Sequence, residues 1–199
     1  MNAQTATLSP AGEYYLNGVM ETASGFKLDK NGTFQFFYSY GALDRFGSGK
    51  WTSKGDHVIL NSEKKHTLDF ALVRSEKKSG DNITIKITDA NPNMLRYVYG
   101  IIATAGKVTQ QAAADSEGMM TFTPQKMDSI FLIFEFCPEK QSEFAIPGNG
   151  HNYFEFRVEP WIMEVNFENF DLQLTEDGLQ GDHPLLAENR KYHYEKAGR

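Results

Sequence analysis

The sequence predicts an all-β protein with little helix, and three observations support this fold class. Apolar and polar residues alternate along many short segments, which is the side-chain period of a β-strand. Glycine, asparagine, aspartate and proline cluster between these segments, as they do in the tight turns that connect strands. Aromatic residues, which favour strands, make up 13% of the 199 residues. Short strands separated by frequent turn signals indicate a β-sandwich or a β-barrel.

The first half of the chain carries a series of strands that follow one another as hairpins. Residues 33–40 alternate so that their aromatic side chains at even positions share one face. Asn31 and Gly32 precede them and supply the positive φ angles of a tight turn, so residues 26–28 form the partner strand. The other strands predicted in this half are 49–53, 57–61 and 66–74.

The second half contains more apolar strands. Residues 82–88 alternate with three isoleucines on one side, whereas residues 129–136 are apolar on both faces except for Glu135. The second pattern suits a central strand that is covered on both sides. Further strands are predicted at 95–104, 153–158, 161–168 and 170–174. Helix signals are limited to residues 108–114 and 184–189, and neither segment is long enough to form a helix on its own.

Two aromatic side chains of the second half, Phe131 and Tyr153, alternate out of phase with the apolar set around them. They are therefore expected on the outer face of their sheet. An outer face that carries aromatic residues and is not covered by another part of the chain favours a partner or a second copy of the chain. The sequence thus raises a homodimer as one interpretation.

A polar and charged segment at residues 75–81 separates the two halves. Such a segment indicates either a domain boundary or a long hairpin turn. A chain of 199 residues is long enough for one or two domains. We therefore predict an N-terminal β unit over residues 1–78 and a C-terminal β-sandwich with an extended tail over residues 79–199.

The segment from Gly47 to Leu60 contains Gly-Lys-Trp followed by Gly-Asp-His-Val-Ile-Leu. It resembles the hairpin of small lipocalin-like β-domains, in which glycine and tryptophan precede a Gly-Asp turn and an apolar strand. In that family short strands wrap a cup. The resemblance implies that residues 1–78 form a lipocalin-like meander or half-barrel.

Residues 82–168 contain an apolar strand that ends at Asp89, then a turn and strand at 114–122, then an apolar strand at 130–133. This succession resembles the transthyretin-like, carboxypeptidase regulatory-like β-sandwich. The resemblance implies a non-catalytic module that binds, braces or presents another molecule. No catalytic residue of that family carries over to this chain.

Charge and hydropathy exclude several classes of protein. The net charge is −6 at pH 7, which argues against a nucleic-acid binder that works through overall positive charge. No apolar run approaches the length of a membrane span, so no membrane insertion is expected. The N-terminus lacks the basic and apolar regions of a signal peptide. We therefore expect a cytoplasmic protein, or a periplasmic or secreted bacterial protein whose signal peptide has been removed.

The most distinctive segment spans residues 38–49 and contains Tyr38, Tyr40, Asp44 and Arg45 together with three glycines. Tyrosine rings stack on sugars and keep a polar end, and an aspartate and an arginine give directional hydrogen bonds. We therefore predict a ligand-recognition loop at these four residues, for a carbohydrate, a small molecule or a protein surface. In the alternative interpretation the segment is only a hairpin turn, with Asp44 as a cap and Arg45 in solvent.

Motifs for catalysis and for metal binding are absent from the sequence. The five histidines are scattered without the spacing of a helical zinc site, and the acidic turns do not follow the EF-hand pattern. The lone Cys137 excludes an internal disulfide, and its place before Pro138 at the end of an apolar strand is typical of an inert cysteine. We predict no metal, no cofactor and no catalytic residue.

These observations predict a non-enzymatic binding or interaction module, exported or acting at a bacterial envelope. Two alternatives from other classes stay open. One is an accessory or hydrolytic enzyme that acts on glycans through an Asp/Glu pair, which requires two facing carboxylates in a cleft. The other is a structural module that associates with itself by burying its outward aromatic residues.

Overall fold

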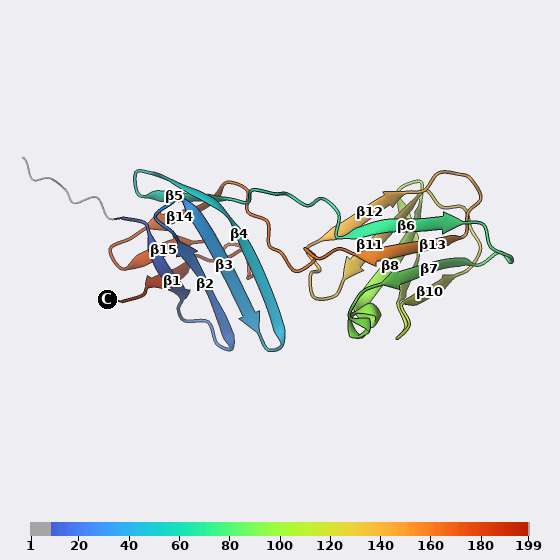
Figure 1. The fold of residues 1–199 in the computed structure, drawn as a ribbon, viewed down its shortest axis with the longest axis horizontal. Helices are drawn as coiled ribbons and strands as arrows, with labels where there is room; N and C mark the ends of the chain where they lie inside the picture. The colour runs from blue at the N-terminus through green and yellow to red at the C-terminus, as the bar shows by residue number, and fades with distance from the viewer. Residues whose placement is uncertain (1–8, 199) are drawn as a thin grey trace, which may run out of the picture. The chain divides into compact units, whose positions relative to one another are not determined.

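The chain divides into two units, and the computed structural model describes residues 9–198 (Figure 1). Within the described residues, unit 1 combines residues 9–65 with residues 163–198, and unit 2 consists of residues 66–162. This division differs from the predicted boundary at residue 78. The charged segment 75–81 lies inside unit 2, where it connects two strands, and the sequence of unit 2 is inserted between two parts of unit 1.

Unit 1 is a closed barrel in which every pair of neighbouring strands is antiparallel. Its strands are β1 (Gly12–Leu16), β2 (Thr22–Leu28), β3 (Thr33–Tyr40), β4 (Leu43–Lys54), β5 (His57–Asn61), β14 (Phe170–Leu174), β15 (Gly178–Gly181) and β16 (Tyr192–Lys196). The order around the barrel is β1-β16-β15-β14-β5-β4-β3-β2. The predicted half-barrel is therefore completed by three strands from the end of the chain.

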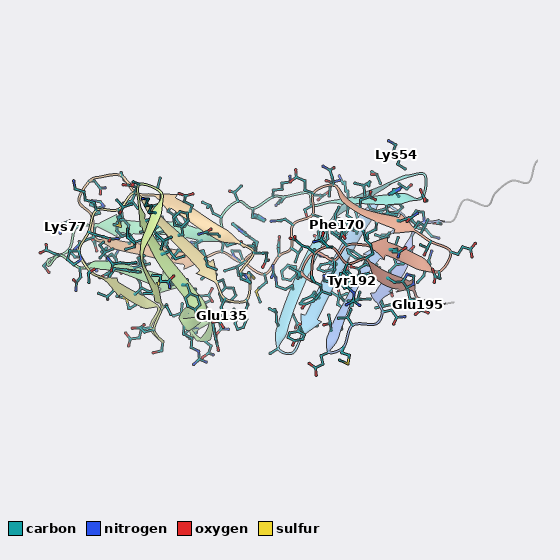
Figure 2. The ribbon with its side chains drawn as sticks, turned by 180° about the vertical axis from the view of Figure 1, so that it is seen from behind. Lys54, Lys77, Glu135, Phe170, Tyr192 and Glu195 are labelled. Atoms are coloured by element: carbon teal, nitrogen blue, oxygen red, sulfur yellow. The ribbon has the colours of Figure 1, made fainter. Side chains whose placement is uncertain are left out.

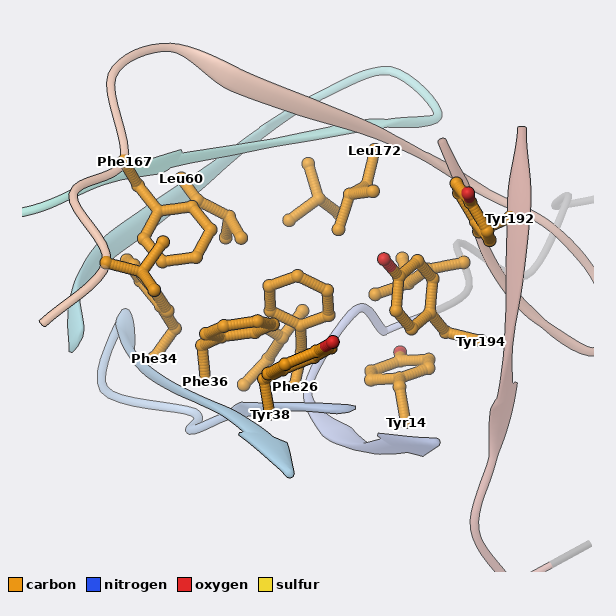
Figure 3. Close-up of a cluster of buried hydrophobic side chains, with 14 residues drawn as sticks. Tyr14, Phe26, Phe34, Phe36, Tyr38, Leu60, Phe167, Leu172, Tyr192 and Tyr194 are labelled. Carbon is orange, nitrogen blue, oxygen red and sulfur yellow. The ribbon is translucent and has the colours of Figure 1, made fainter. Parts of the chain in front are cut away.

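Aromatic side chains fill the interior of the barrel (Figure 3). Phe26, Phe36 and Tyr194 are almost fully buried, and the rings of Phe36 and Tyr194 each lie 5.0 Å from that of Phe26. Phe167, from the segment before β14, packs edge-on against Phe36 and Phe34. A small barrel packed with side chains in this way has a solid core rather than an empty cup.

Unit 2 contains two four-stranded sheets and one short 3-10 helix. The first sheet has the order β10 (Met119–Phe122), β7 (Ile83–Thr88), β13 (Tyr153–Val158), β6 (Phe70–Glu76). The second has the order β12 (Gln141–Ala145), β11 (Ser129–Phe134), β8 (Val98–Thr104), β9 (Lys107–Ala113). The helix η1 (Pro92–Tyr97) lies between β7 and β8. Strands β7 and β13 are parallel, and the other pairs are antiparallel.

The two sheets of unit 2 pack face to face as a β-sandwich. The ring of Phe144 on β12 lies 4.6 Å from that of Phe156 on β13, across the interface between the sheets. Gly100 on β8 leaves room for the sulfur of Met120, which a Cβ atom at this glycine would approach to 2.8 Å. The all-β fold class predicted from the sequence is thus confirmed for both units.

Some predicted elements differ from the structure. Residues 108–114 carry helix signals but belong mostly to β9, because pairing with β8 satisfies their backbone. Residues 161–168 form only one isolated bridge, between Glu164 and Phe46. Tyr153 lies on the outer face of β13 beside Glu155, but it is only 7% exposed, because the ammonium group of Lys78 lies 3.3 Å from its ring centroid. Among the described residues, no helix is long and apolar enough to cross a membrane.

Candidate functional site

The four predicted site residues lie on the β3–β4 hairpin but do not share one exposed surface. Tyr38 and Arg45 are cross-strand partners and are 8% and 3% exposed, so both point into the barrel. Tyr40 is 51% exposed at the end of β3. Asp44 lies on the outer face of β4, where it accepts a hydrogen bond from Ser39 Oγ. Tyr40 pairs with Leu43 on the face of Tyr38 and Arg45, whereas Asp44 pairs with Ser39 on the opposite face, so one ligand does not contact all four residues.

The segment 38–49 is mostly strand rather than loop, because β4 already begins at Leu43. Gly47 serves packing and not a turn: a Cβ atom there would lie 2.6 Å from the ring of Phe167. Arg45 is not solvated, and its Nε donates a hydrogen bond to the carbonyl oxygen of Met163 at 3.0 Å. These contacts give residues 43–49 a structural role in closing the barrel.

A cluster of charged side chains on the outer face of unit 1 has the composition of a catalytic site but not its geometry. His57 Nδ1 lies 2.8 Å from Asp171 Oδ1, and His57 Nε2 lies 3.7 Å from Asp56 Oδ1. The hydrogen bond to Asp171 and the charges of Asp171 and Asp56 raise the pKa of His57. An imidazole that acts as a base for a nucleophile needs one ring nitrogen free for that nucleophile. Here both nitrogens face carboxylates, so the cluster is an ion-pair network.

A pocket at one end of unit 2, which we call the loop-end pocket, is the better candidate. Its volume is about 650 Å³, and three loops line it. Apart from Ile83, the first residue of β7, the lining residues come from the β6–β7, β10–β11 and β12–β13 connections: Lys77, Asp81, Pro124, Gln125, Lys126, Met127, Asp128, Ile146, Pro147, Gly148, Gly150, His151 and Asn152. Figure 2 labels Lys77 at this end of the sandwich. Loops that meet at the end of a rigid sandwich are a frequent place for binding sites.

The side chain of Asn152 holds the β6–β7 loop in place. Its Oδ1 accepts a hydrogen bond from the backbone N–H of Lys78 at 2.7 Å. Its Nδ2 donates to the carbonyl oxygens of Gly80 and Asn82, both at 3.0 Å. Asn152 is 6% exposed, so these bonds form in an environment where leaving them unmade is costly. The β6–β7 wall of the loop-end pocket is therefore formed before any ligand arrives.

The polar groups of the pocket include both hydrogen-bond donors and carboxylates. Asn149 Nδ2 lies 3.2 Å from His151 Nδ1 and can only donate to it, so a neutral His151 carries its proton on Nε2. Lys77 and Lys126 add two ammonium groups. Among the acids, Asp128 accepts a hydrogen bond from the backbone N–H of Ala105 and so fixes a neighbouring turn. The pocket thus offers two ammonium groups and a ring N–H donor beside the carboxylates of Asp81 and Asp128.

The loop-end pocket was not predicted from the sequence, because its walls come from segments far apart in the chain. The only local signal is the Pro-Gly-Asn-Gly loop at residues 147–150. In the part of the chain that the structure describes, no three histidine, cysteine, aspartate or glutamate side chains form a group that could hold a metal ion. Comparison with protein-family models, curated proteins and solved structures finds no match to this chain.

Proposed function

We propose that this protein is a non-enzymatic binding protein and that the loop-end pocket of unit 2 is its ligand site. The observation that carries this proposal is the buried Asn152, whose three hydrogen bonds fix the β6–β7 wall of the pocket. A loop that is already ordered spares the ligand the entropic cost of ordering it. A cavity of about 650 Å³ is also within the range of small-molecule sites.

The lining indicates the chemical class of the ligand. Ile83, Met127 and Ile146 supply apolar contacts, while Lys126 and His151 supply a cation and a ring N–H donor. Pockets of this composition bind the apolar body of a ligand by burial and orient it through a few polar groups. We therefore propose a small organic molecule with an apolar body and an anionic or acceptor-rich end.

The same geometry favours binding over glycan hydrolysis. Hydrolysis of a glycosidic bond uses one carboxyl group as an acid and a second carboxylate on the other side of the bond. The pocket contains Asp81 and Asp128, but Asp128 is engaged by the backbone of Ala105. The acids of the His57 cluster on unit 1 are likewise engaged by cationic or amide side chains.

Binding of anilinonaphthalene sulfonate, which has an apolar ring system and one anionic group, tests this proposal. We expect the full-length protein to bind the dye and the Lys126→Glu variant to bind it about tenfold more weakly, because the substitution replaces an attraction with a repulsion worth about 1 kcal/mol or more. The affinity is measured by fluorescence titration, and the site is located by chemical-shift changes at residues 124–128 and 146–152.

Lys54→Glu is the matched control, because it makes the same charge change on an exposed lysine of unit 1 (Figure 2). This variant should bind the dye as the unmodified protein does. Equal losses in both variants would mean that the dye responds only to net charge. Equal affinities in all three proteins would place the dye elsewhere and would contradict the proposed site.

A second candidate function, self-association, is favoured by an apolar surface on unit 2, which we call the β8–β11 face. It consists of Tyr99 and Ile101 on β8 and their cross-strand partners Ile133 and Phe131 on β11. Tyr99 is 41% exposed, and the other three are partly exposed. Gln111 flanks the face on β9, and Gln141 and the acidic Glu143 flank it on β12. We propose a second copy of the chain as the occupant, since these four apolar side chains form one contiguous strip whose burial favours association.

Sedimentation analysis tests self-association. We expect the unmodified chain to form a dimer and Tyr99→Lys to be monomeric, because a buried unpaired ammonium group opposes association. Val73→Lys is the control, since Val73 is 54% exposed on the other sheet and should leave the dimer intact. A monomeric unmodified protein up to millimolar concentration would rule out this candidate and leave the binding proposal untouched.

A further inference from the structure

A buried histidine lies at one end of the barrel of unit 1. His183 follows β15 and is 5% exposed. Its ring centroid lies 5.5 Å from that of Tyr38, 5.7 Å from that of Tyr192 and 6.2 Å from that of Tyr194. Phe36 completes the surrounding set at 5.8 Å. The imidazole therefore covers part of the aromatic interior of the barrel.

The hydrogen bonds of His183 define its protonation state. The backbone N–H of Leu185 donates to Nδ1 at 3.0 Å, so Nδ1 carries no proton. Nε2 lies 3.0 Å from Ser24 Oγ, and Ser24 Oγ donates to the carbonyl oxygen of Phe37 at 2.8 Å. Because the serine proton is used for Phe37, Nε2 must donate to the serine oxygen. His183 is thus a neutral imidazole with one donor and one acceptor, both satisfied.

We propose that protonation of His183 releases residues 182–186 from the end of the barrel, so that mild acid opens the aromatic interior of unit 1. A proton on Nδ1 replaces an acceptor with a donor that faces the Leu185 N–H, and the hydrogen bond that holds the segment is lost. The new positive charge is also formed among aromatic rings and away from water, which is unfavourable.

Among the residues that the structure describes, no carboxylate faces His183 to offset this charge. The polar side chains that β2, β3 and β16 place next to His183 are Ser24, Tyr38, Tyr192 and Tyr194, and each of them carries only a hydroxyl group. Strand β4 places the cation of Arg45 beside Tyr38. Asp182 directs its carboxylate to Lys191 at 2.9 Å, and its backbone oxygen accepts from Tyr194.

The direction of the pH effect follows from the burial. Burial lowers the pKa of His183 to about 4, whereas the released, solvated side chain has the ordinary value of 6.5. Above pH 6.5 His183 is largely unprotonated in both the closed and the released form. Between pH 6.5 and pH 4 the released form binds a proton more readily than the closed form does. The equilibrium constant for release therefore rises as the pH falls, by about 30-fold between pH 7.5 and pH 5.

The segment can open without unfolding of the whole unit. Residues 182–191 form no strand, and residues 187–191 are exposed. Local openings of such segments have lower free energies than global unfolding. Each strand of the barrel, in contrast, is hydrogen-bonded to a neighbouring strand on both of its sides.

Hydrogen exchange of the full chain, followed by mass spectrometry between pH 5 and pH 7.5, tests the proposal. We expect the opening constant of peptides that cover residues 181–188, after correction for the intrinsic exchange rate, to rise about 30-fold toward pH 5. In His183→Gln it should stay constant, because glutamine keeps a neutral donor and acceptor. His57→Gln, which alters an exposed histidine of the same unit, should behave as the unmodified protein does. The same pH dependence in His183→Gln as in the unmodified protein would overturn the proposal.

A direct titration keeps the test independent of the variants. The carbon-bound ring proton of His183, followed by nuclear magnetic resonance, should titrate well below pH 6.5 while the barrel remains folded. A midpoint at the ordinary value would show that the closed barrel accommodates the imidazolium, and this result would also overturn the proposal.

Discussion

Gly178→Ala is expected to destabilise unit 1 by about 3 kcal/mol or more, because this glycine has no room for a side chain. A Cβ atom at Gly178 would lie 2.0 Å from the backbone oxygen of Tyr194 and 2.9 Å from its carbonyl carbon. Both atoms belong to β16, which pairs with β15 on one side and with β1 on the other. The clash can therefore be relieved only if β15 and β16 move apart, which breaks the hydrogen bonds between them. A loss of this size is a large part of the stability of an ordinary domain.

Urea unfolding followed by tryptophan fluorescence measures this effect. Trp51 belongs to unit 1 and Trp161 to unit 2, so a Trp161→Phe background reports unit 1 alone. Gly41→Ala in the same background is the control. Gly41 has a φ of 58°, and a Cβ atom added to it would meet open space, so only the backbone penalty of about 1 kcal/mol applies. Equal losses for the two variants would contradict a steric role for Gly178.

Local alternation predicts the strands of this protein well, but it does not predict which strands pair. Residues 33–40 and 82–88 alternate clearly in the sequence, and they coincide closely with β3 and β7. Closure of the barrel depends instead on the pairing of Tyr14 with Lys196, at opposite ends of the chain. No local periodicity carries that information, so a half-barrel and a boundary at residue 78 are what the sequence alone suggests.

The candidate site could not be predicted for a related reason. Gly47 and Gly49 resemble turn residues in the sequence, yet both lie within β4. Each position requires glycine because another segment of the chain packs too close to leave room for a side chain. Arg45 and these two glycines fall on every second residue, and this period of two is the signal that the strand continues through them. The loop-end pocket requires three loops that only the folded sandwich brings together, and Asn152 is inconspicuous without its backbone partners.

Asp69→Leu is expected to destabilise unit 2 by about 3–5 kcal/mol, because it removes one partner of a buried ion pair. Lys140 Nζ lies 2.6 Å from Asp69 Oδ1, and the two side chains are 16% and 8% exposed. Lys140 Nζ also donates to the carbonyl oxygen of Ile162 at 3.0 Å. The pair therefore joins residues near both ends of the sequence of unit 2. In the variant, the ammonium group stays in a poorly solvated site without the carboxylate that faces it.

The double variant Asp69→Leu/Lys140→Met separates the cost of removing one partner from the value of the pair. We expect it to be about as stable as the unmodified protein, since two apolar side chains can replace a buried ion pair at little cost. Urea unfolding of a Trp51→Phe background, read through Trp161, reports unit 2. If the losses of Asp69→Leu alone and of Lys140→Met alone simply add in the double variant, the charges are not coupled. A strong recovery would show that the two charges are coupled and that the intact ion pair adds little net stability to unit 2.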